Sequence, residues 1–145
     1  MLFNKLKNLF KSREKIERAI PKIKLKKDNI RNCEIVLDRE ELLSKIPKNS
    51  IIAEIGVDEG DFSSKILNKA QPKLLCLIDM WGTNRYGEVK AELVNSKFIN
   101  EIKKNIISIY RSDSINATNL FDNEFFDWIY IDTDHSYETT YKELN

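Results

Sequence analysis

The chain has 145 residues, which is room for one domain, and its composition of 41% hydrophobic and 32% charged residues is typical of a globular protein. Its longest apolar runs are strand-sized, and the N-terminus lacks the apolar core and cleavage site of a secretory signal. We therefore expect a cytoplasmic protein without a membrane span. Cys33 and Cys76 form neither a disulfide framework nor a metal-binding spacing, and we expect both to be reduced packing residues.

Charge is distributed unevenly along the chain, although the formal net charge is only +1. Residues 1–31 contain 11 Lys and Arg against three acidic residues, whereas the rest contains 13 basic and 20 acidic residues. This pattern predicts a basic arm and linker over residues 1–37, followed by a mildly acidic domain over 38–145. A mildly acidic domain does not favour a nucleic-acid partner.

The arm has apolar residues at helical spacing, among them Leu2, Leu6 and Leu9, with lysines between them, and Pro21 limits the helix. A basic amphipathic helix of this kind binds anionic membrane surfaces or packs on protein. Because the apolar stripe is short, we favour packing on its own domain or on a partner subunit, which leaves a homo-oligomer open.

Alternating strands and helices follow from residue 38. Asp38 and Glu41 resemble a capping box and predict a helix that runs through Lys45. We expect apolar strands at 51–55, 74–78, 106–110 and 127–131. We expect helices at 61–69, capped by Asp61, at 88–104, after Ser114 as a cap, and from Ser136 onward. The helix at 88–104 has an apolar stripe at helical spacing, formed by Val89, Leu93, Phe98 and Ile102. This order predicts an α/β fold with a parallel sheet and right-handed crossovers.

The turn after the first strand contains Gly56 and Gly60, flanked by four acidic residues. The glycine spacing differs from the Gly-x-Gly-x-x-Gly of nicotinamide enzymes, and no Gly-Lys-Ser/Thr follows. Clustered carboxylates repel a pyrophosphate but suit a cationic ligand. A purely structural glycine turn is the alternative interpretation.

Each of the four strands is predicted to place an acid near the same edge of the sheet, where ligands bind in open α/β folds. These acids are Glu54, Asp79, Asp113 and Asp132. Asp79 follows Gly56 by 23 positions, close to the offset of about 20 at which an acid binds a ribose diol in dinucleotide folds. Four acids at one edge predict a binding site.

Three segments together resemble the motifs of class I S-adenosylmethionine-dependent methyltransferases, in particular the macrocin O-methyltransferase-like subfamily. They are 53–63 (AEIGVDEGDFS), 77–81 (LIDMW) and 126–138 (FDWIYIDTDHSYE). The resemblance covers residues 38–145 and implies a Rossmann-like parallel sheet of order 3-2-1-4, flanked by helices. It also implies that Glu54, Gly56 and Gly60 contact the methionine part of the cofactor, that Asp79 binds the ribose, and that Asp113 and Ser114 lie by the adenine.

The resemblance further implies that Asp132 faces the reacting centre. In some relatives this position ligates Mg²⁺ and a histidine three residues later is the base, a pattern that His135 completes. Thr133 departs from the glycine that most relatives have there. A structural hydrogen bond at a helix start is the alternative role for His135.

The leading functional hypothesis is methyl transfer to a hydroxyl of a small molecule or a sugar, which requires alignment of the reactants and a base such as histidine. The alternative is a non-catalytic module that binds the cofactor weakly or pairs with a partner through an open sheet edge. The glycine spacing disfavours a nicotinamide oxidoreductase. The resemblance also implies further strands after residue 145, so we hypothesise a domain incomplete at its C-terminal side, a truncated product or fragment with compromised activity, whose apolar fourth strand is an edge.

Overall fold

The structure is a computed structural model that describes residues 24–83 and 87–144. The chain from Val36 onward forms one compact unit, and the described residues before it belong to another. Residues 24–35 contain one 3-10 turn, η1 (Lys27–Ile30), and an ion pair between Arg31 and Asp28. The predicted arm helix lies outside the described residues. Cys33 is exposed, so its expected packing role is wrong, whereas Cys76 is buried.

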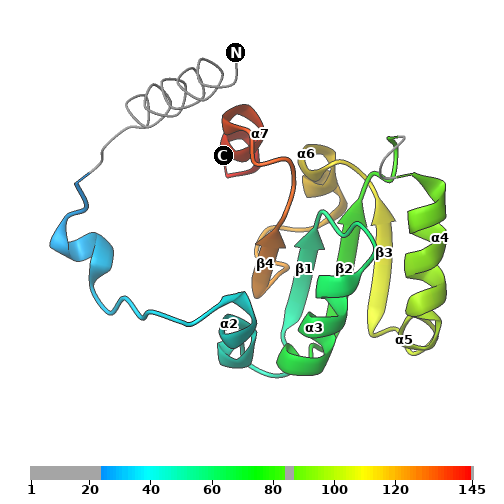
Figure 1. Cartoon of the computed structure of the whole chain (residues 1–145), viewed down its shortest axis with the longest axis horizontal. Helices are drawn as coiled ribbons and strands as arrows, with labels where there is room; N and C mark the ends of the chain where they lie inside the picture. Colours follow the sequence, from blue (N-terminus) through cyan, green and yellow to red (C-terminus); the bar gives the residue numbers. More distant parts are fainter. Residues whose placement is uncertain (1–23, 84–86, 145) are drawn as a thin grey trace, which may run out of the picture. The chain divides into compact units, whose positions relative to one another are not determined.

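Four parallel strands form the sheet of the second unit: β1 (Ile51–Ile55), β2 (Leu74–Asp79), β3 (Ile107–Arg111) and β4 (Trp128–Ile131). Their order is β3-β2-β1-β4, as Figure 1 shows, and this confirms the predicted α/β fold with strand order 3-2-1-4. Ile55 of β1 is in register with Ile78 of β2 and Ile131 of β4. The carboxyl ends of the strands therefore lie together at one edge.

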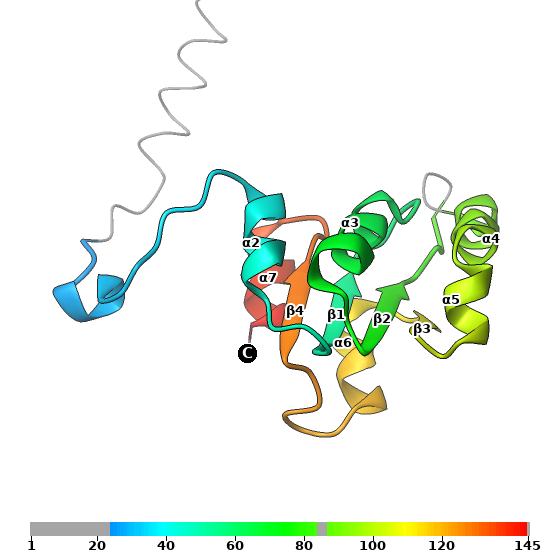
Figure 2. The same ribbon diagram turned by 90° about the horizontal axis from the view of Figure 1, so that it is seen from below.

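Helices flank this sheet, with α2 and α3 on one side and α6 on the other (Figure 2). Their bounds are α2 (Arg39–Lys45), α3 (Asp61–Ala70), α4 (Glu88–Lys97), α5 (Ile99–Lys103), α6 (Ser114–Ala117), η2 (Thr118–Leu120) and α7 (Tyr137–Glu143). Residues of α4 share a core cluster with those of α2 and α3, so these helices pack on the same face. Helix α7 contacts α6.

Side-chain caps at two helices agree with the sequence. The Asp38 carboxylate accepts the N–H groups of Glu40 and Glu41, and the Ser136 hydroxyl accepts that of Thr139. In a capping box the Glu41 carboxylate would accept the N–H of Asp38. Here it accepts the N–H of Leu37, one residue earlier.

Two other predicted caps are wrong. Helix α3 begins after Gly60, whose left-handed backbone turns the chain, and Asp61 is already helical. Helix α6 is capped by Asp113, whose carboxylate accepts the N–H of Asn116, while Ser114 is its first residue. In both cases the helix begins one residue before the expected start. The residue that was expected to be the cap, Asp61 or Ser114, is instead the first residue of the helix.

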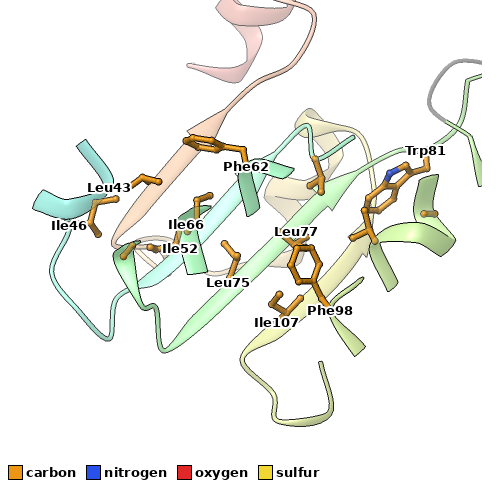
Figure 3. Close-up of a cluster of buried hydrophobic side chains, with 14 residues drawn as sticks. Leu43, Ile46, Ile52, Phe62, Ile66, Leu75, Leu77, Trp81, Phe98 and Ile107 are labelled. Atoms are coloured by element: carbon orange, nitrogen blue, oxygen red, sulfur yellow. The ribbon is translucent and has the colours of Figure 1, made fainter. Parts of the chain in front are cut away.

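The single helix expected over 88–104 is two, because the backbone leaves the helical region at Phe98, which separates α4 from α5. The expected buried stripe is also partly wrong: Val89 is 79% exposed, whereas Ala91 and Val94 are buried. The break lets Phe98 pack inward against the core, where Figure 3 shows it near Ile107 and Leu77.

The core is unequal on the two faces of the sheet. The larger cluster joins alternate strand residues such as Ile52, Leu75 and Leu77 with α2, α3 and α4 (Figure 3). The smaller cluster, under α6 and the segment that leads to β4, has four fully buried members: Ala53, Cys76, Ile78 and Ala117. No helix within 24–83 and 87–144 is long and apolar enough to cross a membrane.

Candidate functional site

A cavity of about 1030 Å³ lies at the carboxyl ends of all four strands. Its walls come from the segments that follow each strand, with additions from α2, α3 and α7. Six of the eight predicted site residues line it: Glu54, Gly56, Asp79, Asp113, Ser114 and Asp132. Gly60 and His135 lie outside the lining.

The two glycines of the first turn are required by the fold itself. Gly56 has a φ of +87°, and a Cβ there would lie 2.2 Å from the carbonyl oxygen of Asp132. Gly60 has a φ of +73°, and a Cβ would lie 2.7 Å from the ring of Phe98. Gly56 thus allows the end of β1 to approach the end of β4 closely, and Gly60 begins α3 away from the cavity.

Asp79 fixes the turn that follows β1. Its Oδ2 accepts the N–H groups of Val57 and Asp58 at 2.8 and 3.0 Å, and its Oδ1 accepts that of Trp81 at 3.0 Å. A carboxylate has about four acceptor sites, so this one retains room for about one further donor. The predicted ribose-binding residue is therefore also the residue that shapes the cavity wall.

Glu54 is buried between the sheet and α3, where it accepts a hydrogen bond from the Ser63 hydroxyl. Burial raises the pKa of Glu54 to about 8. The hydrogen bond from Ser63 opposes this rise, and the negative charge of Asp132 adds to it. Glu54 is therefore largely protonated at neutral pH. It lines the cavity as a polar neutral group and not as the anion that the sequence suggested.

Lysines neutralise the acidic residues of the turn from outside the lining. Lys90 of α4 forms ion pairs with Asp58 and with Glu59, the latter at 3.0 Å. Lys97 pairs with Asp61 at 2.6 Å and holds the pKa of that carboxyl below its usual range. These pairs hold α4 and the turn together and reduce the negative potential of the cavity.

At the β3 end of the cavity, Asp113 and Ser114 begin α6. The Asp113 carboxylate accepts from the backbone N–H and the side-chain amide of Asn116, and these bonds lower its pKa. Asp113 thus remains an anion near the predicted adenine position.

At the β4 end, Asp132 is at the centre of a polar cluster. Its Oδ2 lies 3.4 Å from Nη1 of Arg39 and accepts from the Tyr130 hydroxyl at 3.3 Å. Its Oδ1 lies 3.1 Å from Nε2 of His135. The imidazole is mostly exposed and outside the cavity lining, so this geometry matches the structural hydrogen bond considered for His135.

The residues around Asp132 do not form a cation site of the usual kind. Within the described part of the chain, no three His, Cys, Asp or Glu side chains are grouped to hold a metal ion. Oxygen-ligated Mg²⁺ is bound by carboxylates, waters and substrate oxygens, whereas Asp132 here faces a guanidinium.

The lining also includes residues to which the sequence assigned no role in the site, among them Arg39, Phe62, Trp81 and Lys142. Trp81 is buried, and its indole N–H donates to the carbonyl oxygen of Asp58 at 3.0 Å. The motif at 77–81 could have indicated Trp81 as part of the wall. Arg39 carried no signal, because the helix it begins was not expected to reach the sheet edge.

S-adenosylmethionine suits this arrangement on chemical grounds. Its sulfonium and amino groups are cations, its ribose donates hydroxyl hydrogens, and the cavity offers carboxylates at the ends of β2, β3 and β4. The cavity volume of about 1030 Å³ lies just above the roughly 300–1,000 Å³ that is typical of small-molecule sites.

No protein-family profile and no curated protein sequence matches the chain. Similar solved structures include a protein from Thermoplasma acidophilum assigned as a methyltransferase, at 18% identity and a TM-score of 0.50, over 68% of this chain and 39% of that one. An rRNA methylase from Streptococcus thermophilus matches at 11% identity and a TM-score of 0.54, over 76% and 63%. A protein from Streptococcus mutans assigned as a methyltransferase, in complex with S-adenosylhomocysteine, matches at 15% identity and a TM-score of 0.52, over 72% and 59%.

The chain thus spans between 39 and 63% of the lengths of these proteins. Identities this low establish a likeness of fold. What these comparisons show is a chain with the Rossmann-like architecture of solved methyltransferase structures.

Proposed function

We propose that this chain carries the cofactor-binding part of an S-adenosylmethionine-dependent methyltransferase that methylates a hydroxyl of a small molecule or a sugar. One observation carries the proposal: Gly56, Asp79, Asp113 and Asp132, which lie at the carboxyl ends of four different strands, line a single cavity. The fold shared with solved methyltransferase structures supports it, as does the S-adenosylhomocysteine bound to one of them.

In this proposal the residues act by holding the reactants in line. Asp79 accepts from a ribose hydroxyl while it keeps the turn after β1 in place, and Asp113 and Ser114 border the adenine. Methyl transfer from a sulfonium is an in-line displacement, in which orientation supplies much of the rate enhancement. The cofactor supplies the methyl group, and Asp132 and its neighbours border the acceptor.

The proton of the acceptor hydroxyl is the remaining requirement. His135 is the one histidine of the chain, and its contact with Asp132 would orient it as a base. Since the imidazole lies outside the cavity lining, this role requires the loop at 133–136 to bring it inward. In the absence of such a movement, Asp132 is the nearest candidate base.

Calorimetry with S-adenosylhomocysteine tests the proposal. We expect micromolar affinity, lost in Asp79→Ala and retained in Asp122→Ala, which removes an exposed acid outside the cavity. Asp79→Asn serves as a second variant, with circular dichroism to verify folding, because Asp79 also holds the turn. Absence of binding at millimolar ligand would contradict the proposal. A methyl-transfer screen with hydroxyl acceptors would then define the substrate.

A second candidate is a non-catalytic module that pairs with a partner through the sheet. The outer edge of β4 has no neighbouring strand among the described residues, and Ile129 on it is 46% exposed. Unpaired apolar edges favour association with another chain. A chain that fails to bind S-adenosylhomocysteine but sediments as a dimer would favour this candidate.

A further inference from the structure

The cavity has two cationic side chains on its lining, and both lie at the β4 end. They are Arg39, which begins α2, and Lys142, in the last turn of α7. The other lysines near the site, Lys90 and Lys97, hold carboxylates of the turn after β1. Carboxylates therefore occur at both ends of the cavity, with Asp132 and Asp134 at the β4 end, whereas cations of the described lining occur only toward β4.

Arg39 is held in place by contacts on three sides. Its guanidinium stacks over the Phe62 ring, 4.5 Å from the centroid, and Nη1 donates to the Tyr130 hydroxyl at 2.7 Å. The same Nη1 lies 3.4 Å from Asp132. Stacking and a fixed hydrogen bond orient the planar group before any ligand arrives.

The guanidinium also retains hydrogen-bonding capacity. It carries five N–H donors, and its hydrogen bonds to the described residues all come from Nη1. The side chain is about half exposed and lines the cavity. The Nη2 and Nε edge is therefore available to an anion, and a carboxylate fits this edge with two parallel bonds.

The proposed cofactor has one group that the carboxylates of the cavity cannot bind, namely the carboxylate of its methionine part. Adjacent strands lie about 4.8 Å apart, so the cavity edge extends about 14 Å from β3 to β4. A nucleoside held at Asp79 and Asp113 leaves its amino-acid end to lie toward β1 and β4, where Arg39 is.

We propose that Arg39 binds the α-carboxylate of the cofactor, with Lys142 as the other cation of the described lining. This inference rests on the proposed function. It assigns a binding role to a residue of α2 and explains why an arginine is held beside Asp132. The competing ligand for Arg39 is an anionic methyl acceptor, and the test below distinguishes it from the cofactor carboxylate.

Calorimetry with two ligands tests the assignment. S-adenosylhomocysteine has the carboxylate, whereas 5′-methylthioadenosine has the same nucleoside without the amino-acid part. For Arg39→Gln we expect about a tenfold or greater loss of affinity for S-adenosylhomocysteine, as for a charged hydrogen bond, and unchanged affinity for 5′-methylthioadenosine. Arg39→Lys should lose less, because it keeps the charge but not the two parallel bonds.

Lys73→Gln is the charge-matched control, because Lys73 precedes β2 at the opposite edge of the sheet. The loss in Arg39→Gln should persist in an Asp132→Asn background, where no unpaired carboxylate repels the ligand. If Arg39→Gln leaves the affinity for S-adenosylhomocysteine unchanged, the assignment is overturned and an anionic acceptor is favoured as the ligand of Arg39. If Arg39→Gln weakens the binding of both ligands equally, the assignment is also overturned, because the substitution then affects the cavity in general. If the unsubstituted protein binds 5′-methylthioadenosine but not S-adenosylhomocysteine, the assignment fails while a nucleoside site remains. Binding of neither ligand contradicts the proposed function itself.

Discussion

The Glu54 carboxyl and the Ser63 hydroxyl form a buried hydrogen-bonded pair that joins β1 to α3 at the wall of the cavity. Glu54 is only 1% exposed, and no lysine or arginine forms an ion pair with it in the described part of the chain. Burial without a cation accounts for the rise of its pKa to about 8. The folded protein therefore keeps this group protonated over a range in which an unfolded chain ionises it.

This pair predicts that stability falls as pH rises. The contribution of neutral Glu54 is complete below the unfolded pKa of 4.5 and is lost as pH rises toward about 8, because the unfolded chain releases the proton first. Between these values the slope from this one group approaches about 1.4 kcal/mol per pH unit. Urea unfolding at a series of pH values measures it.

Glu54→Gln should flatten that slope, because the amide is neutral at every pH and can still accept from Ser63. Glu92→Gln, which changes an exposed carboxyl of α4 that forms no ion pair among the described residues, is the control and should leave the slope unchanged. A pH dependence in Glu54→Gln equal to that of the unsubstituted protein would contradict a protonated Glu54.

The glycine at the end of β1 predicts a second effect on stability. Gly56→Ala places a Cβ 2.2 Å from the Asp132 carbonyl at a φ of +87°. Strain and steric overlap together should reduce the free energy of unfolding by about 3 kcal/mol or more. Gly82→Ala is the control: the nearest atoms lie 3.8 Å away, so a change within about 0.5 kcal/mol is expected from denaturant unfolding. Similar losses in both variants would show that the β1–β4 approach is not tight.

Helix α4 contains a matched pair of valines that tests which face is buried. Val94 is 0% exposed in the core and Val89 is 79% exposed, although the sequence pattern placed Val89 on the buried stripe. Val94→Ala should cost about 2 kcal/mol of unfolding free energy, and Val89→Ala well under 1 kcal/mol. Equal costs, or the reverse order, would favour the continuous helix over 88–104.

The parallel α/β fold and the shared edge of the site could be predicted from the sequence, because short apolar runs alternate with helical segments and an acid follows each run. The strand order came from the resemblance to methyltransferases. Periodicity alone could not place the break at Phe98, since that residue fits a continuous helical stripe and also fits the space against Gly60. Likewise, Asp79 was identifiable as a site acid, but its bonds to Val57 and Asp58 arise from the path of the turn.

Arg39 shows the limit of sequence reasoning more clearly. It follows the capping residue Asp38 and has the pattern of any exposed first-turn residue. Its contacts with Phe62 and Tyr130 depend on α2 lying beside α3 and β4. Arg39 and Tyr130, which share a hydrogen bond, are 91 positions apart in the chain. A cation assembled from tertiary packing leaves no local signal.

The position of Arg39 also predicts how Mg²⁺ affects the site. Since a guanidinium already lies beside Asp132 and the described residues group no three metal ligands, we expect millimolar Mg²⁺ and excess chelator to give the same affinity for S-adenosylhomocysteine. Calorimetry in the two buffers measures this, with Asp132→Asn as the comparison. A metal site at Asp132 would instead show tighter binding with Mg²⁺ that disappears in Asp132→Asn, because removal of the carboxylate charge removes the principal oxygen ligand. That result would require Arg39 to leave Asp132 when the cation binds, and it would contradict the fixed cluster seen here.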